Sequence, residues 1–286
     1  VEEAPVESYA DREGFREDSF LEDGLAVKRP RLTAALEADV LHPVSAEGTD
    51  GYVVHYTNFS LVMCSSRRMC FYSAVNIDGK ESVSIRGRRP RWRKDSRLLP
   101  LETQIQHECY GDERYGKFSR GHMTRREDPN WGPQATKAND DTFHVTNACP
   151  QMQPFNAGIW LGLEDYALEN ARQDEMRICV FTGPVLGAND PDYFGVKVPE
   201  WFWKVIAFIH DETGELTATG YKMDQRDVLP GEEFVYGRHG CYQTSLKEIE
   251  ALTGLSFGEL VERDPYRVVE EAPATPLLSF DQVRFT

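Results

Sequence analysis

The sequence predicts an α+β fold with a largely antiparallel β-sheet flanked by helices. Runs rich in Val, Phe and Tyr have the length of strands, and two segments show helix signals in apolar spacing or in capping residues. The expected strands and helices do not alternate regularly, as they would in βαβ units. The chain has 286 residues, of which 40% are hydrophobic and 28% charged, so it can bury a sizeable core. No apolar run approaches the roughly eighteen residues that a membrane span needs, and we expect no membrane partner.

Six segments are expected to form strands. Turn residues between these segments favour antiparallel connections. Residues 76–79 are expected to form a turn, and Gly183-Pro184 is expected to end a strand. Residues 211–214 predict the turn of a hairpin. The expected strands are 52–56, 59–63, 69–77, 175–182, 201–210 and 216–223.

Two helices are predicted. The first begins near Asn156 and has Trp160 and Leu163 on one side. The second begins at Ser245, where Glu248 completes a capping box, and it ends at Gly254.

The two ends of the chain differ from its middle. Residues 1–34 are acidic and then basic with little periodicity, which predicts an arm or linker, and 266–286 resembles a tail. The division is therefore 1–34, a domain over 35–265, and 266–286. The chain begins at Val1 rather than Met, as a processed chain would, so a missing signal peptide says little. The location stays open: a cytoplasmic one is weakly favoured, and a secreted, periplasmic or organellar one is the alternative.

Charge is unevenly distributed along the chain. Net charge is −15, yet residues 67–126 contain 15 Lys and Arg against 7 Asp and Glu, which leaves −23 on the other 226 residues. This pattern permits a phosphate-binding face on an acidic body, although an ordinary solvated surface gives the same count. The six cysteines contain no C-x-x-C pair, which disfavours a zinc ribbon, and pairing of Cys64 with Cys70 stays open.

Arg120 and His122 flank one glycine. Residues two apart in an extended segment point to the same side, so a guanidinium and an imidazole would face one pocket. The planar guanidinium suits phosphate oxygens, and an imidazole suits general-base work near neutral pH.

The expected helix near Asn156 supplies a third group. Asn156, Trp160 and Glu164 share one i, i+4 ridge. An amide oxygen is a ligand that Mg²⁺ accepts, and Mg²⁺ takes only one or two protein ligands beside water and phosphate. Asn156, with Glu164 reaching a metal-bound water, is therefore an adequate Mg²⁺ site.

Together these motifs resemble the DNA/RNA non-specific endonucleases, the ββα-metal (His-Me finger) nucleases. The matching motifs are Ser119-Arg-Gly-His122, Thr146-Asn-Ala-Cys-Pro-Gln151, Asn156-Ala-Gly-Ile-Trp160 and Leu163-Glu164, in the family's order. The resemblance spans roughly residues 50–260. The family usually has Asp where this chain has Ser119, which leaves the support of the His122 loop open.

The resemblance implies a role for each matched residue. His122 would be the general base, and Arg120 would bind phosphate. Asn156 would ligate Mg²⁺ directly, and Glu164 would hold its water. Asn147 would brace the loop of the site.

A second phosphate-binding arginine is also implied, before an aromatic-x-x-Asp pattern that here is Trp92-Arg-Lys-Asp95. Arg91 is the candidate, with Arg89 or Arg93 as alternatives. The basic run around it is expected to bind the nucleic-acid backbone without reading bases. The expected nucleic-acid-binding residues are Arg88, Arg89, Arg91, Arg93, Lys94 and Arg120.

The expected function is Mg²⁺-dependent, sequence-non-specific endonuclease activity on DNA, RNA or both, with Mn²⁺ able to replace Mg²⁺. Two alternatives on the same fold stay open: a catalytically silent nucleic-acid-binding module, and a toxin or defence nuclease regulated by a partner. A homodimer and a regulatory domain or partner also stay open.

Overall fold

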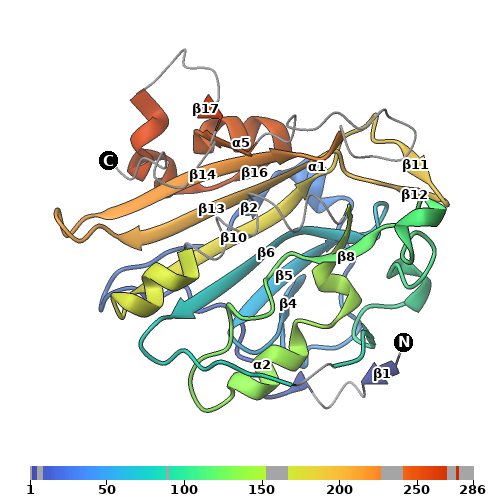
Figure 1. The fold of residues 1–286 in the computed structure, drawn as a ribbon, viewed down its shortest axis with the longest axis horizontal. Coiled ribbons are helices and arrows are strands. Elements are labelled where there is room, and N and C mark those ends of the chain that lie inside the picture. The colour runs from blue at the N-terminus through green and yellow to red at the C-terminus, as the bar shows by residue number, and fades with distance from the viewer. Residues whose placement is uncertain are drawn as a thin grey trace.

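A nine-stranded antiparallel sheet runs through the centre of the molecule (Figure 1). The computed structural model describes residues 2–4, 9–87, 90–152, 167–226, 241–268 and 275–276. The strand order is β17-β15-β14-β13-β10-β6-β5-β4-β3. In chain order its strands are β3 (Thr49–Asp50), β4 (Val53–His55), β5 (Phe59–Cys64), β6 (Met69–Asp78), β10 (Arg177–Val185), β13 (Trp201–Ile209), β14 (Leu216–Asp224), β15 (Cys241–Thr244) and β17 (Thr275–Pro276).

Short elements surround this sheet. The helices are α1 (Ala34–Glu37), α2 (Ala135–Asp141) and α5 (Leu246–Thr253), and 167–173 is also helical. The short 3₁₀ turns are η2 (Leu101–Thr103), η3 (Glu113–Tyr115), η4 (Val145–Asn147), η6 (Gly258–Arg263) and η7 (Pro265–Val268). The paired short strands are β1 (Glu2–Ala4) with β7 (Arg93–Asp95), β2 (Arg31–Leu32) with β16 (Leu255–Ser256), β8 (Ser119–His122) with β9 (Ala148–Gln151), and β11 (Asp192–Tyr193) with β12 (Val196–Lys197).

Both faces of the central sheet are buried. In the β6–β10 pair, Val75 lies opposite Val180, and Ala74 lies opposite Phe181. Val75 and Val180 belong to a core cluster that also contains Phe118, the residue before β8. Ala74 and Phe181 belong to a second core cluster, which lies beneath α5. Since side chains alternate between faces along a strand, the sheet separates a site layer from a helix-covered layer.

The predicted α+β class and antiparallel sheet are confirmed, and all six predicted strands are present. Two predicted ends are wrong. β6 continues to Asp78, through the expected turn at 76–79, because it is paired with β10 up to Arg177. Gly183-Pro184 lies inside β10 rather than ending it.

Pro184 fits a central strand because the ladder pairing on one side of it has already ended. The pairing of β10 with β6 ends at Thr182, while the pairing with β13 continues through Pro184 opposite Phe202. Proline lacks an N–H donor and is tolerated where no ladder bond is needed on that side. The Pro184 carbonyl accepts a hydrogen bond from Trp203 Nε1 at 3.2 Å.

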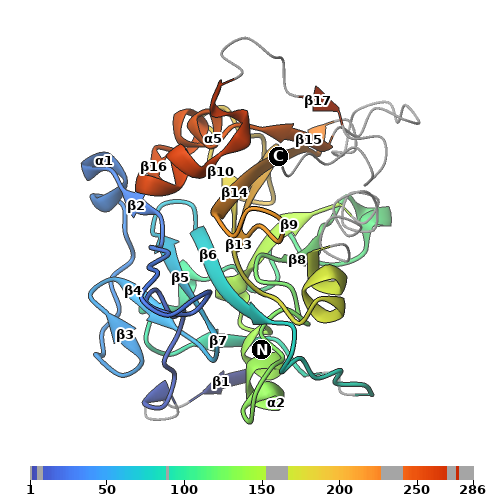
Figure 2. The ribbon, with the colours of Figure 1, turned by 90° about the vertical axis from the view of Figure 1, so that its left-hand side faces the viewer.

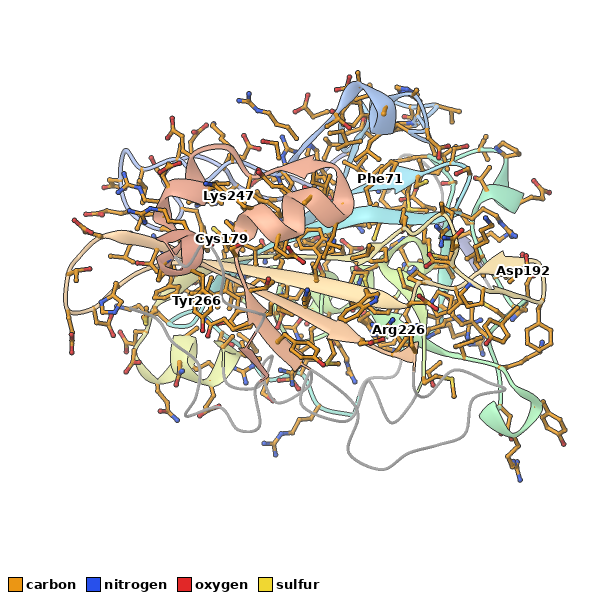
Figure 3. The ribbon with its side chains drawn as sticks, turned by 90° about the horizontal axis from the view of Figure 1, so that it is seen from above. Phe71, Cys179, Asp192, Arg226, Lys247 and Tyr266 are labelled. Carbon is orange, nitrogen blue, oxygen red and sulfur yellow. The ribbon has the colours of Figure 1, made fainter. Side chains whose placement is uncertain are left out.

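The predicted second helix is confirmed as α5. Ser245 Oγ accepts a hydrogen bond from the Glu248 N–H at 3.2 Å, and Gly254 ends the helix with φ +72°. Viewed from above, α5 lies across the sheet and Cys179 lies beneath it (Figure 3). The predicted first helix begins near Asn156, outside the described residues. After that gap, the structure describes a helical stretch over 167–173.

Residues 9–34 are not a detached arm or linker. Tyr9, Phe15, Phe20 and Val27 are buried, and the Phe15 ring lies 5.4 Å from the ring of Phe181. The chain here is irregular, so its buried residues follow no strand or helix period and the sequence gives no pattern to read. In Figure 2 this segment runs along the side of the sheet, below α1. Within the expected tail, η7 and β17 are described, and β17 pairs with β15.

All six cysteines are buried and free, so Cys64 and Cys70 form no disulfide. Within the ranges that the structure covers, no helix is long and apolar enough to cross a membrane.

Candidate active site

The two-stranded β8–β9 sheet carries Arg120 and His122. Arg120 pairs with Pro150, Gly121 with Cys149, and His122 with Ala148. This small sheet packs on one face of the central sheet through Cys149 and the adjoining Phe118, which are fully buried. A rigid strand therefore holds the two candidate catalytic side chains.

His122 lies in a triangle of aromatic rings. Its ring centroid is 4.9 Å from that of Trp92 and 5.1 Å from that of Phe143, and the latter two rings are 5.2 Å apart. Arg120 lies over one ring of this triangle and over a further ring, with its Cζ 5.7 Å from the centre of the Trp92 ring and 4.6 Å from that of the Tyr110 ring. Arg120 and His122 thus both contact Trp92, as the i, i+2 spacing predicts.

His122 is held as a neutral imidazole. Its Nε2 atom is buried and has no hydrogen-bond partner among the residues that the structure describes. Burial, and secondarily the charge of Arg126, lowers the pKa of His122 to about 4. A neutral ring with an unpaired nitrogen can accept a proton at physiological pH.

Gly121 allows Gln151 to lie against the strand between Arg120 and His122. A Cβ at position 121 would come 1.9 Å from Gln151 Oε1. Gln151 is buried, and both polar atoms of its side chain lack a partner within the described part of the chain. A buried, unsatisfied amide costs free energy unless it binds something, so Gln151 is a candidate site residue.

Asn147 joins the chain after His122 to the segment that leads into β9. Its Oδ1 accepts from the Thr124 N–H at 2.8 Å, and its Nδ2 donates to the carbonyls of Thr124 and Thr142 at 2.9 and 3.0 Å. The Met123 N–H donates to the Asn147 carbonyl at 2.9 Å. All polar atoms of the Asn147 side chain are thus used in holding the site's backbone.

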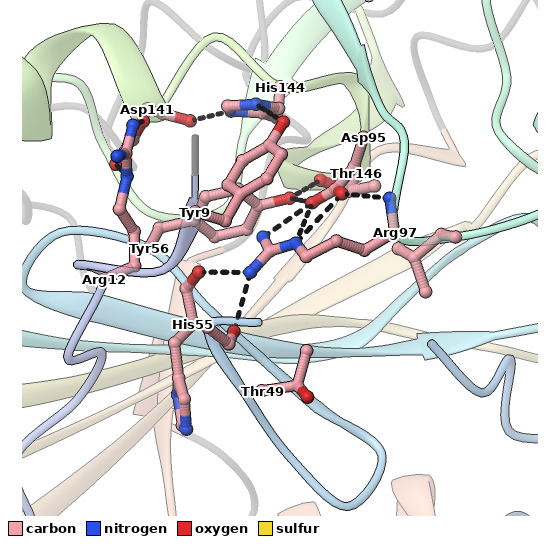
Figure 4. A network of polar contacts seen from close by, with 12 residues as sticks. Tyr9, Arg12, Thr49, His55, Tyr56, Asp95, Arg97, Asp141, His144 and Thr146 are labelled. Atoms are coloured by element: carbon pink, nitrogen blue, oxygen red, sulfur yellow. Dashed lines mark hydrogen bonds and ion pairs between the residues drawn. The ribbon is translucent and has the colours of Figure 1, made fainter. Parts of the chain in front are cut away.

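A buried polar network anchors the segment before Asn147 (Figure 4). Arg12 donates to both carboxylate oxygens of Asp141, at 3.0 and 3.1 Å. Tyr9 hydroxyl bonds His144 Nε2 at 2.7 Å, and His144 Nδ1 bonds the Asp141 carbonyl at 2.7 Å. Two residues of the N-terminal segment therefore fix the chain that supports the site.

Asp95 and Arg97 form the other half of this network. Both side chains are fully buried, and Arg97 donates to Asp95 Oδ2 at 2.7 Å. Tyr56 hydroxyl bridges Asp95, at 2.5 Å, to Thr146, at 2.8 Å. The Arg97 guanidinium also lies 3.8 Å from the centre of the Tyr9 ring. The aspartate of the Trp92-Arg-Lys-Asp95 pattern is thus a structural anchor.

The basic run does not present a uniform phosphate-binding surface. Arg93 donates to the Asp140 carbonyl at 3.3 Å, and Lys94 donates to the Leu101 carbonyl at 2.9 Å. Arg91 is exposed. Arg88 and Arg89 lie outside the described residues.

The two predicted metal residues, Asn156 and Glu164, also lie outside the described residues. Elsewhere in the chain that the structure describes, no group of three or more His, Cys, Asp or Glu could hold a metal ion. The fit of a metal must therefore be judged from the atoms around His122.

Sequence reasoning missed the parts played by Trp92, Phe143 and Gln151. Trp92 was noted only as the aromatic residue of the Trp92-Arg-Lys-Asp95 pattern, and Phe143 had no assigned role. A signal for Gln151 was present, since it ends the Thr146–Gln151 motif. No comparable signal marked the two aromatic residues, because their meeting at His122 is a tertiary contact.

Comparison with known proteins agrees with this geometry. The family model for the DNA/RNA non-specific endonucleases matches residues 37–264. The uncharacterized protein y4fB of Sinorhizobium fredii is 36% identical over 282 residues, covering 92% of this chain and 41% of that protein. Mitochondrial Endonuclease G of Bos taurus is 28% identical, covering 51% of this chain and 50% of that protein. The nuclease of Serratia marcescens is 26% identical, covering 59% and 61%.

A crystal structure of the EndoG/EndoGI complex, described as showing the mechanism of EndoG inhibition, has the same fold. Its TM-score is 0.57 at 21% identity, and the match covers 73% of this chain and 86% of that one. The expected ββα-metal nuclease fold is confirmed. This fold and the match over 37–264 define a domain of the hydrolytic nuclease class. The chain belongs to the DNA/RNA non-specific endonuclease family.

Proposed function

We propose that the chain is a Mg²⁺-dependent endonuclease that hydrolyses phosphodiester bonds of DNA, RNA or both without sequence specificity. The observation that carries this is the neutral His122, whose Nε2 has no partner in the described structure, on the same strand as Arg120. Family membership supports the reaction class, although the chain spans only 41% to 61% of the relatives named above.

His122 is the general base in this mechanism. Its neutral imidazole takes a proton from the attacking water, and the aromatic triangle holds the ring in place while partly excluding bulk water. Arg120 binds the phosphate and offers fixed positive charge where negative charge develops. Asn147 keeps the backbone after His122 in position.

The atoms around His122 fit a hydrated cation with few protein ligands. Gln151 and His122 leave buried polar atoms without described partners, and an amide with a neutral imidazole tolerates a nearby divalent ion and its waters. We assign Asn156 as the Mg²⁺ ligand and Glu164 as the residue that holds its water. When bound, Mg²⁺, or Mn²⁺ in its place, supplies positive charge beside the phosphate oxygens and the leaving oxygen.

The test compares the wild-type protein with His122→Ala on plasmid DNA and on RNA, with Mg²⁺ and with excess EDTA. We expect EDTA to stop cleavage, re-added Mg²⁺ to restore it, and His122→Ala to lower the rate by about 10²–10⁴-fold, the usual worth of a general base.

The variant must stay folded, which circular dichroism and thermal unfolding verify. Cleavage by His122→Ala at the wild-type rate, or undiminished cleavage in EDTA, would contradict the mechanism. Binding without any cleavage by the wild type would favour the silent nucleic-acid-binding module.

A further inference from the structure

Gln225 directly follows β14 and is fully buried. Its N–H donates to the Glu200 carbonyl at 2.9 Å, which extends the antiparallel pairing of β14 with β13 by one step. Its side chain contacts the end of β9, the strand of the small β8–β9 sheet that ends at Gln151. Gln225 therefore joins the central sheet to the strand that carries a candidate site residue.

The side-chain amide of Gln225 binds three backbone groups. Its Oε1 accepts from the Met152 N–H at 3.2 Å, and its Nε2 donates to the carbonyls of Pro150, at 3.2 Å, and Pro199, at 2.5 Å. The Pro150 carbonyl and the Met152 N–H belong to the two peptide groups on either side of the Gln151 Cα atom. The planes of these two groups set φ and ψ of Gln151, so Gln225 fixes the direction in which the Gln151 side chain leaves the backbone.

The Gln151 side chain depends on this support for its orientation. Both of its polar atoms are buried and lack a hydrogen-bond partner among the described residues. It lies against Gly121, on the strand that also carries Arg120 and His122. Apolar packing holds β9 against the sheet but is non-directional, whereas the hydrogen bonds from Gln225 have a direction.

We propose that Gln225 is a positioning residue for the reaction and that it acts through Gln151. The inference rests on the proposed endonuclease function, in which the N–H groups of the Gln151 amide donate to a phosphate oxygen of the polynucleotide. Gln225 itself touches no substrate. When its bonds to the backbone are lost, the Gln151 amide turns away from the phosphate, while Arg120 and His122 stay in place on β8.

Gln104 provides a matched control, because its buried side-chain amide also binds three backbone groups. Its Oε1 accepts from the Asp95 N–H at 2.8 Å, and its Nε2 donates to the carbonyls of Asp95 and Leu98, at 2.7 and 2.8 Å. These bonds hold the turn after β7, and none of the three is made to β9. Replacing either glutamine with methionine removes the same amide and keeps a side chain of similar length and volume.

The experiment is a double-mutant cycle on the full chain, with kcat measured for plasmid cleavage in Mg²⁺. Its four proteins are the wild type, Gln225→Met, Gln151→Met and the double variant. A displacement of about 1 Å in a catalytic site can lower the rate about 10²-fold, and we expect Gln225→Met to lower kcat by roughly 10- to 100-fold. In the Gln151→Met background we expect the same change to lower kcat by less than about twofold, because the group through which Gln225 acts is already gone.

Gln104→Met is combined with Gln151→Met in the same way. We expect Gln104→Met to change kcat by the same factor in the wild-type and Gln151→Met backgrounds, since its bonds do not hold Gln151. A purely structural Gln225 would behave like Gln104, with equal factors in both backgrounds, and this result overturns the inference. Gln151→Met with the kcat of the wild type overturns it as well.

Thermal unfolding shows whether each variant is folded. If Gln225→Met does not fold, Gln225→Asn takes its place in the cycle, because it keeps the amide and shortens its reach by one methylene. The expected and the contrary results stay the same.

A second measurement does not depend on activity. In the NMR spectrum of the ¹⁵N-labelled protein, the side-chain NH₂ signals of Gln151 report the surroundings of this amide. We expect these signals to shift or broaden in Gln225→Met and to stay unchanged in Gln104→Met. Unchanged Gln151 signals in Gln225→Met overturn the inference.

Failure of the inference and failure of the proposed function give different results. A wild-type protein that cleaves, with equal factors for Gln225→Met in both backgrounds, removes the role of Gln225 and keeps the endonuclease. A wild-type protein that does not cleave, with the Gln151 signals shifted in Gln225→Met, keeps the support of Gln151 by Gln225 and removes the endonuclease. A wild-type protein that does not cleave, with the Gln151 signals unchanged, overturns both.

Discussion

His122 is half-buried with its Nε2 atom out of contact with solvent, and burial together with the charge of Arg126 lowers its pKa and keeps the ring neutral. Arg120 and His122 could be placed together from the sequence, since residues two apart on a strand share a side. Arg126 could not, because its relation to His122 depends on Phe143, which arrives from another segment. Local spacing predicts neighbours on one element, whereas contacts between elements need the fold.

Gly121 offers a test at this scale. In Gly121→Ala the new Cβ would come 1.9 Å from Gln151 Oε1, so the Gln151 side chain must move away from the strand. A displacement of about 1 Å in a catalytic site can lower the rate by about 10²-fold, and we expect a loss of this order in kcat with a small change in melting temperature.

The control is Gly24→Ala at a glycine whose Cβ would meet nothing within 4 Å. Gly24 has φ +78°, so some loss of stability is expected there, but no loss of kcat. A Gly121→Ala protein with the kcat of the wild type would show that Gln151 can move without consequence.

At the scale of elements, the N-terminal segment is part of the support of the site. Tyr9 and Arg12 bind His144 and Asp141, and these precede the segment that carries Asn147. Since the family model begins at residue 37, this support lies outside the matched region. We propose that residues 9–34 belong to the nuclease domain.

Arg12→Ala tests this proposal. Removing the guanidinium leaves the buried Asp141 without its ion-pair partner, and breaking a buried pair typically costs about 3–5 kcal/mol. We expect a lower free energy of unfolding, measured in urea, together with a lower kcat.

Arg16→Ala is the comparison, because its backbone rather than its side chain binds Asn76. Equal stability of Arg12→Ala and Arg16→Ala would contradict the idea that the N-terminal segment anchors the site.

At the scale of the whole molecule, the strands of the central sheet could be predicted from the sequence, but the irregular segments that pack on its faces could not. Long runs of Val, Ile, Phe and Trp predict strands such as β13, and the hairpin turns between strands predict their antiparallel pairing. Residues 9–34 cover the sheet without regular structure, so no periodicity reveals them. The charge excess of 67–126 was also only a partial guide, because Arg97 is a fully buried anchor.

Stability should fall in mild acid. Burial lowers the pKa of His55 and of His144 to about 4, against about 6.5 in the unfolded chain. Between about pH 6.5 and pH 4 these histidines are therefore protonated in the unfolded chain but neutral in the folded chain. The free energy of unfolding is thus highest above about pH 6.5 and falls as the pH drops towards 4. For the fully buried His144 the loss is at most about 3.4 kcal/mol.

Urea unfolding at pH 7.5, 6 and 5 measures this dependence. His55→Gln should flatten it, because one of the histidines that titrates only in the unfolded state is gone. The same free energy of unfolding at pH 7.5 and pH 5 would show that these histidines are protonated in the folded protein.

The reactivity of the six buried thiols reports local opening of the folded chain. Burial raises the pKa of Cys64 to about 11 and that of Cys109 and of Cys241 to about 12, so the folded chain exposes almost no thiolate near neutral pH. An alkylating reagent will therefore modify a cysteine only when the surrounding layer separates. Because Cys109 lies in the site layer and Cys179 in the layer under α5, the order in which they are modified records which side of the sheet opens first.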